Sequence, residues 1–192
     1  HTSGPLRAAS DVDRSRAIVQ SDIDRLLAQP NLSVRQRLNM LRYKDSRDGR
    51  DGLERLAELI PAPDEIEPAV DIDAGGYMFW SNLKQQMQGA LMVFQSGLGS
   101  AADLSLSGFD SHDEHDPISD ALFAHLADAL NFFWDQAEKA GLADRILLVV
   151  GSDFGRTNHY NDANGKDHWP VGSYMIMERG ATWGDRVVGL SD

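Results

Sequence analysis

A run of Ile, Leu and Val at Arg145–Gly151 (RILLVVG) narrows the fold class more than any other segment, because such runs are typical of strands buried on both faces of a sheet. In residues 118–140, apolar side chains recur at four-residue steps, which predicts a helix that Gly141 ends. Before this helix, Ala102–Ser107 alternates apolar and polar residues and predicts another strand. Strand, helix and strand in this order predict a right-handed parallel unit. The predicted fold class is therefore α/β, a parallel sheet flanked by helices.

The chain is predicted to have three parts. Residues 1–60 are highly charged and form a helical region. Residues 61–76 are rich in Pro and acidic side chains, which indicates a connecting loop. Residues 77–192 form the C-terminal part of the α/β domain, with a helix pattern from about Leu83 and a weaker third strand at Ser173–Met177.

Within the helical region, the apolar spacing predicts three separate helices. The first runs to about Ala28, the second covers residues 33–43, and a short third one covers residues 53–60. The polar, Gly-containing stretch at residues 44–52 predicts a turn between the second helix and the third. Nothing in this region indicates chemistry, so we interpret it as a helical layer or arm.

The charge balance and the missing cysteines exclude several classes of function. The formal net charge is −12 at pH 7, which argues against a nucleic-acid partner because phosphate binding needs a basic surface. The chain has no cysteine, so disulfides and thiolate metal sites are excluded. No apolar run approaches the roughly 18 residues that a membrane-spanning helix needs.

Acidic and imidazole side chains follow both predicted strands. Ligands of open parallel sheets bind beyond the carboxyl ends of the strands, so we expect Asp110 and Asp153 to emerge side by side. A third cluster lies in the loop after the second strand and is expected to fold back over this edge. The candidate ligands are all carboxylates or imidazoles: Asp110, His112, His115, Asp153, Asp167 and His168.

Carboxylate and imidazole ligands together predict a divalent metal site. Zinc is favoured, and manganese, iron or calcium are the alternatives. His112 and His115 are alternative imidazole ligands from the same motif. A solvated acidic loop would give the same sequence pattern, and this alternative stays open. His125 lies within the predicted amphipathic helix, where a surface or core role is more common than metal binding.

Three motifs carry a family resemblance. Gly108–His112 (GFDSH) resembles the G-W-D-T-H motif of the bacterial family called domain of unknown function 1501, Ser152–Thr157 (SDFGRT) resembles its S-E-F-G-R-T motif, and Asp167–Pro170 (DHWP) resembles its D-H-x-x segment. The resemblance covers about residues 83–190 and is looser over residues 1–75. That family is related to alkaline phosphatases and sulfatases, and its members usually carry a twin-arginine export signal. The resemblance therefore implies a periplasmic or extracellular protein.

The resemblance also implies roles for individual residues. Asp110 and His112 (or His115) would bind one metal with His168, and Asp153 would bind a second metal or bridge the two. Arg156 would be the catalytic cation, free to hold an anionic oxygen of the substrate. Two departures from the pattern put a full two-metal site in doubt. Asp153 replaces the commoner Glu, and Phe154 stands where many superfamily relatives have a histidine ligand.

The resemblance and the candidate ligands together predict a metal-dependent hydrolase of phosphate or sulfate esters. This chain would represent its C-terminal metal-binding half. The alternatives are a non-catalytic exported metal-binding or structural protein of the same fold, and a helical interaction module in residues 1–60. The expected partner is a small anionic ester. We further expect the chain to lack the superfamily's N-terminal nucleophile, to be inactive on its own, and to associate with itself or with an N-terminal half.

Overall fold

The computed structural model describes residues 9–189, which fall into two compact units that divide between Glu58 and Leu59. The first unit contains helices α1 (Ala9–Leu27) and α2 (Val34–Leu59), and this boundary lies close to the predicted end of the helical region. The first eight residues of the predicted 1–60 region, and the last three of the 77–192 region, lie outside the described residues.

A side-chain cap begins the second helix of the first unit, and an ion pair links it to the first helix. Helix α2 begins with a reciprocal capping box, in which the amide of Gln36 donates to Ser33 Oγ (3.3 Å) and the amide of Ser33 donates to Gln36 Oε1 (3.0 Å). Arg16 of α1 forms a two-pronged ion pair with Glu54 of α2, at 2.9 and 2.7 Å. Because these contacts are mostly exposed, each contributes little to the free energy of unfolding.

The predicted turn at residues 44–52 is wrong. Helix α2 continues through this segment without a break, including Gly49 and Gly52. Glycine inside a helix costs about 1 kcal/mol relative to alanine, which is too little to end a helix that is paired with a neighbour. Lys44, the first residue of this segment, also reaches back to α1 and forms an ion pair with Asp24 at 2.9 Å.

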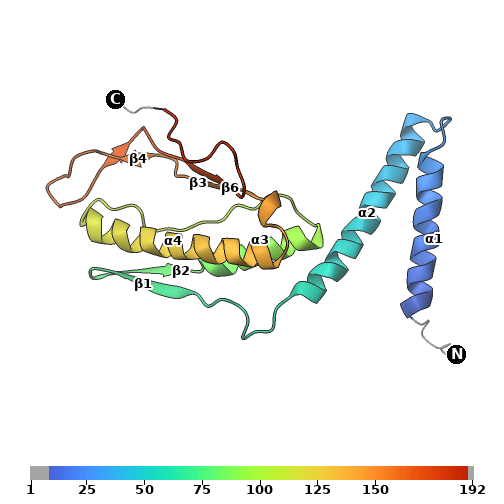
Figure 1. Cartoon of the computed structure of the whole chain (residues 1–192), viewed down its shortest axis with the longest axis horizontal. Helices are drawn as coiled ribbons and strands as arrows, with labels where there is room; N and C mark the ends of the chain where they lie inside the picture. The colour runs from blue at the N-terminus through green and yellow to red at the C-terminus, as the bar shows by residue number, and fades with distance from the viewer. Residues whose placement is uncertain (1–8, 190–192) are drawn as a thin grey trace. The chain divides into compact units, whose positions relative to one another are not determined.

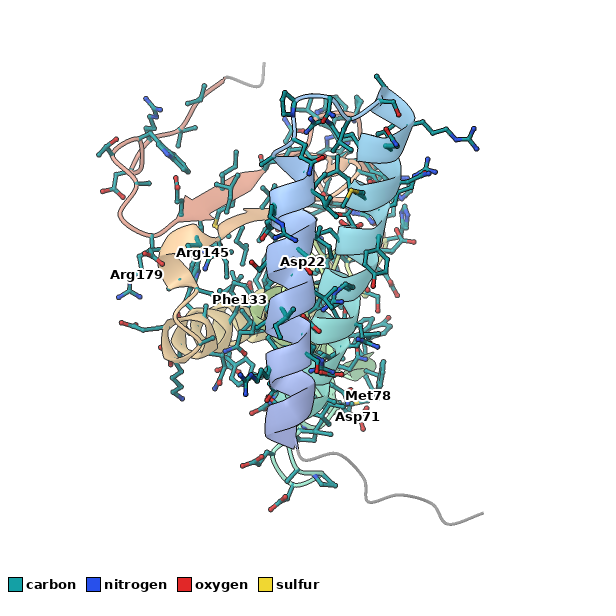
Figure 2. The ribbon with its side chains drawn as sticks, turned by 90° about the vertical axis from the view of Figure 1, so that its right-hand side faces the viewer. Asp22, Asp71, Met78, Phe133, Arg145 and Arg179 are labelled. Carbon is teal, nitrogen blue, oxygen red and sulfur yellow. The ribbon has the colours of Figure 1, made fainter. Side chains whose placement is uncertain are left out.

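The second unit begins with a β-hairpin that the sequence patterns did not predict. Strands β1 (Val70–Ala74) and β2 (Tyr77–Ser81) pair antiparallel, and Gly75 and Gly76 connect them with φ angles of 67° and 106°. Two positive φ angles in a two-residue turn are what the twist of a hairpin requires, and glycine adopts them without strain. Asp71 on β1 and Met78 on β2 are both exposed on this hairpin (Figure 2).

Two hydrophobic clusters form the core of the second unit, and helix α4 (His115–Lys139) contributes to both. In the larger cluster, Phe133 of α4 packs with Met87 of helix α3 (Leu83–Ser96). In the smaller cluster, Leu122 of α4 packs against β1. Figure 1 shows α4 running between the β1–β2 hairpin and the strands of the C-terminal part. The 3₁₀ turn η1 (Ala143–Arg145) follows α4 and leads into the next strand.

The predicted parallel sheet is wrong. Within residues 9–189 the strands form only antiparallel pairs, namely β1 with β2, β3 (Leu147–Val150) with β6 (Met175–Glu178), and β4 (Gly155–Arg156) with β5 (His168–Trp169). Strand β3 is also not buried on both faces. Leu148 packs against the larger cluster, whereas Leu147 and Val149 are 60% and 55% exposed.

The segment predicted as the first strand is extended but joins no sheet. Both backbone groups of Ser105 are bonded to one side chain of α3, because its amide donates to Gln86 Oε1 (2.9 Å) and Gln86 Nε2 donates to its carbonyl (3.0 Å). The strand predicted from the alternating pattern is therefore wrong. Among the described residues, no helix is long and apolar enough to cross a membrane.

Candidate metal centre

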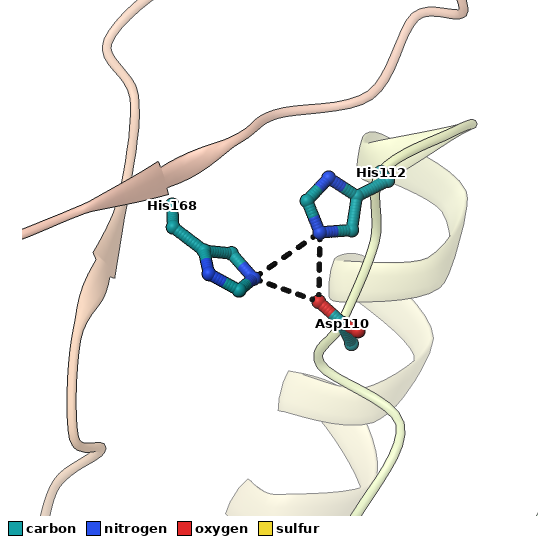
Figure 3. A group of neighbouring side chains, drawn as sticks. All are labelled: Asp110, His112 and His168. Atoms are coloured by element: carbon teal, nitrogen blue, oxygen red, sulfur yellow. Dashed lines mark hydrogen bonds and ion pairs between the residues drawn. The ribbon is translucent and has the colours of Figure 1, made fainter.

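Three of the predicted ligands converge from two segments that are far apart in the sequence. Asp110 and His112 lie on the extended segment before α4, and His168 begins β5 (Figure 3). The distance from Asp110 Oδ1 is 3.1 Å to His112 Nε2 and 3.2 Å to His168 Nε2, and the two Nε2 atoms are 3.1 Å apart. All three residues are exposed, so the triangle of potential ligand atoms faces solvent.

The size of this triangle fits a metal ion. A tetrahedral zinc ion with nitrogen and oxygen ligands about 2.0–2.1 Å away has about 3.3 Å between neighbouring ligand atoms. An octahedral ion with ligands about 2.1 Å away has about 3.0 Å between them. The observed separations of 3.1 to 3.2 Å lie between these two values. Two imidazoles and one carboxylate also leave further coordination positions open, as in catalytic zinc sites.

Arg156 reaches the centre but is held by other groups. Its Nη2 donates to Asp110 Oδ1 (2.6 Å) and to the carbonyl of Phe109 (3.0 Å), and its Nη1 donates to the carbonyl of Lys166 (2.9 Å). The side chain is only 15% exposed. We expected Arg156 to be free of structural ion pairs, and the structure instead pairs it with a predicted metal ligand.

The pair with Arg156 controls the ionisation of Asp110. The hydrogen bond from Arg156, followed by that from His168, lowers the pKa of Asp110 from its ordinary value of 3.8 to about 2. Because the pKa is lower in the folded protein, this carboxylate stabilises the fold above about pH 4, and that contribution is lost as the pH falls towards 2.

Replacing Arg156 with glutamine is therefore expected to raise the pKa of Asp110 towards 3.8, since the largest cause of the shift is removed. Carbon-13 NMR titration of the Asp110 carboxyl group measures this change directly. Arg179→Gln is the matched control, because Arg179 pairs with Glu138 away from the centre. An Asp110 pKa that stays near 2 in Arg156→Gln would contradict this assignment.

Asp167 lies behind His112 and outside the triangle. Its Oδ1 is 3.0 Å from Nδ1 of His112, the ring nitrogen opposite to the one that faces Asp110 and His168. This hydrogen bond is the main cause that lowers the pKa of Asp167, and a bond from Asn161 is the next. Asp167 was predicted among the metal ligands, and the structure brings it to the outer side of one of them.

His115 is directed to the protein interior. It begins α4, and its Nδ1 lies 2.6 Å from Oγ of Ser111, which is fully buried. Burial lowers the pKa of His115, and the positive charge of Lys166 adds to this effect. Of the two alternative imidazoles in the first motif, the structure thus brings His112 to the triangle and leaves His115 outside it.

Asp153 does not join the group, which among the described residues consists of Asp110, His112 and His168. The predicted placement of Asp110 and Asp153 at the ends of adjacent parallel strands is wrong, because β3 pairs only with the antiparallel strand β6. The next residue, Phe154, does reach the centre. Its ring packs against His168 in a tilted arrangement with 4.1 Å between ring centroids, and it therefore covers one side of that imidazole.

The loop that carries Asp167 and His168 is docked on the segment that carries Asp110 and His112. The amide of Lys166 donates to the carbonyl of Ser111 (3.0 Å), and the amide of His115 donates to the carbonyl of Asn164 (2.9 Å). Gly165 makes this close approach feasible, because a Cβ atom there would overlap the carbonyl oxygen of His112. Neither Asn161 nor Gly165 was among the predicted site residues, although the adjacent Asn164 and Gly165 are a typical turn signal.

Comparisons with known proteins identify a family and no characterised relative. A family model described as "Protein of unknown function (DUF1501)" matches residues 26–192, a range that includes every candidate ligand. A search of the curated proteins found no match, and a search of the solved structures found none. The resemblance predicted from the three motifs is thereby confirmed, and the match says nothing about alkaline phosphatases, sulfatases or export.

Proposed function

The chain belongs to the DUF1501 family of proteins of unknown function, and we propose that Asp110, His112 and His168 form a divalent-metal site in a hydrolase of phosphate or sulfate esters. The observation that carries the proposal is the convergence of one carboxylate oxygen and two imidazole nitrogens to within 3.2 Å of one another. Zinc is the favoured ion because this set of ligands is that of a catalytic zinc site.

Each residue of the proposed site has a separate task. Asp110 is ionised at physiological pH, and the hydrogen bond from Arg156 lowers its pKa further, to about 2. The Nε2 atoms of His112 and His168 can bind a metal only when they carry no proton. Protons therefore compete with the metal for these two atoms. A metal held there would neutralise ester oxygens and activate water, the chemistry that hydrolysis of an anionic ester needs. Arg156 adds a positive charge beside the same carboxylate.

The hydroxyl groups near the centre are engaged by other atoms. Ser111 is fully buried and bonded to His115, Ser152 Oγ donates to the carbonyl of Phe154 (2.7 Å), and Thr157 Oγ1 donates to the carbonyl of His159 (2.8 Å). None of these three hydroxyls is placed to attack an ester at the triangle. Water is therefore the nucleophile in our proposal.

A non-catalytic metal-binding role is the second candidate, and the contacts of Arg156 favour it. Arg156 already donates to Asp110 and to two backbone carbonyl groups, which is a structural use of a guanidinium group. In this role, the metal would fix the loop around His168 to the segment around Asp110, as structural zinc sites do.

An assay separates the two candidates. The protein as the cell produces it is incubated with aryl phosphate and aryl sulfate, with and without added zinc. The hydrolase proposal predicts zinc-dependent turnover of at least one ester, and its loss in His168→Ala. Tight zinc binding by the same preparation with no turnover of either ester would instead support the non-catalytic role.

A further inference from the structure

We propose that Asn161 is a positioning residue of the metal centre, which acts through Asp167 to hold the His112 ring with its Nε2 atom towards Asp110 and His168. The inference rests on the proposed metal site. Asn161 lies in the loop before β5, and its side-chain amide contacts both the backbone of His112 and the carboxylate of Asp167. No feature of a single segment would reveal this role, since Asn161 and His112 are 49 positions apart.

The orientation of the Asn161 amide is fixed by its partners. Its Oδ1 accepts hydrogen bonds from the backbone amides of Ala163 (3.0 Å) and Gly165 (2.9 Å). Because a backbone N–H can only donate, the atom facing these two groups has to be the oxygen. The two N–H groups of Nδ2 then point to the carbonyl of His112 (2.8 Å) and to Oδ1 of Asp167 (3.3 Å). Both donors and both acceptor positions of the amide are thus used.

This arrangement places a carboxylate oxygen where it orients the imidazole ring of His112. Asp167 Oδ1, held by Asn161, is 3.0 Å from His112 Nδ1. An ionised carboxylate accepts hydrogen bonds only, so it holds the ring through an N–H bond from Nδ1. Nε2, on the opposite side of the ring, consequently faces Asp110 and His168, at 3.1 Å from each. Histidine ligands of metal sites are usually oriented by such a carboxylate on the opposite nitrogen.

Asn161→Asp tests this chain of contacts with little change of shape. The aspartate keeps oxygen acceptors for the amides of Ala163 and Gly165, so the turn is retained. It loses both N–H donors and places a second negative charge next to Asp167. Asn158→Asp is the matched control, because it adds the same charge in the same loop but contacts His159 rather than His112 or Asp167.

The first measurement needs no metal. Crystal structures of the metal-free protein show whether Nδ1 of His112 lies within hydrogen-bond distance of Asp167. We expect this contact in the wild type and in Asn158→Asp, and a rotated His112 ring in Asn161→Asp. Asp167→Ala is expected to release the ring in the same way, because Asn161 acts through Asp167. An unchanged His112 ring in Asn161→Asp would overturn the proposal.

Zinc titration of the same proteins is the second measurement. Loss of an orienting partner typically weakens metal binding by about 10- to 100-fold, and we expect a loss of this size in Asn161→Asp relative to Asn158→Asp. Equal zinc affinity in these two variants would overturn the proposal. If the wild type shows the Asn161-dependent orientation of the His112 ring and yet binds no zinc, the positioning role stands and the proposed metal function fails.

Discussion

Replacing His168 with alanine is expected to weaken zinc binding by about 100-fold or more. His168 Nε2 lies 3.2 Å from Asp110 Oδ1 and 3.1 Å from His112 Nε2, so the variant removes one of three converging ligand atoms. Removing a residue that only orients a ligand costs about 10- to 100-fold, and loss of a ligand itself should cost more. The hydrophobic core should be unaffected, because the side chain of His168 is 53% exposed.

Isothermal titration of metal-free protein with zinc measures this effect. His159→Ala is the matched control, because His159 is an exposed histidine of the same loop whose Nδ1 pairs with Asn158. We expect the control to bind zinc as the wild type does. Wild-type affinity in His168→Ala would remove His168 from the site and, with it, the observation on which the proposed function depends.

Replacing Gly165 with alanine is expected to weaken zinc binding by about 10- to 100-fold and to destabilise the fold by about 1–3 kcal/mol. The added Cβ would overlap the carbonyl group of His112 and the amide of Asp113, which are backbone groups that cannot rotate away. The loop must therefore move off the segment that carries Asp110 and His112. That movement separates His168 from the other two ligands and breaks the backbone bond from Lys166 to Ser111.

Thermal unfolding and zinc titration together check this prediction. Gly89→Ala is the control with the opposite expected sign. Gly89 lies in helix α3 with open space where a Cβ would be, so alanine should stabilise the fold by up to about 1 kcal/mol and leave zinc affinity unchanged. If Gly165→Ala behaved like Gly89→Ala, the loop would not be docked as described.

The candidate ligand residues could be named from the sequence because their chemistry is local, and their binding of a metal stays a prediction. Asp110 and His112 follow an extended segment, and Asp167 and His168 adjoin in a polar loop. Residue type and spacing indicated a metal site without any knowledge of the fold. The orientation of His115 could not be predicted in this way. It depends on α4 beginning at that residue, which directs the imidazole towards the buried Ser111.

The topology could not be predicted, because an apolar run does not specify its partner. The pattern at β3 gave the right extended segment, but the strand that pairs with it returns antiparallel from Met175–Glu178. The other predicted strand pairs with no strand, and the amide and carbonyl of its Ser105 bond to the side chain of Gln86 instead. The role of Asn161 was also hidden. Its turn signal is local, whereas its contact with His112 forms only when the loop docks.

A crystal structure of the protein grown with zinc tests the central claim most directly. An anomalous difference map recorded at the zinc absorption edge locates the ion without reference to the surrounding atoms. The account predicts one zinc ion per chain, bound by Asp110 Oδ1 and by the Nε2 atoms of His112 and His168, with Asp167 still on Nδ1 of His112. A zinc ion bound elsewhere, or no zinc at this triangle in protein saturated with the metal, would contradict it.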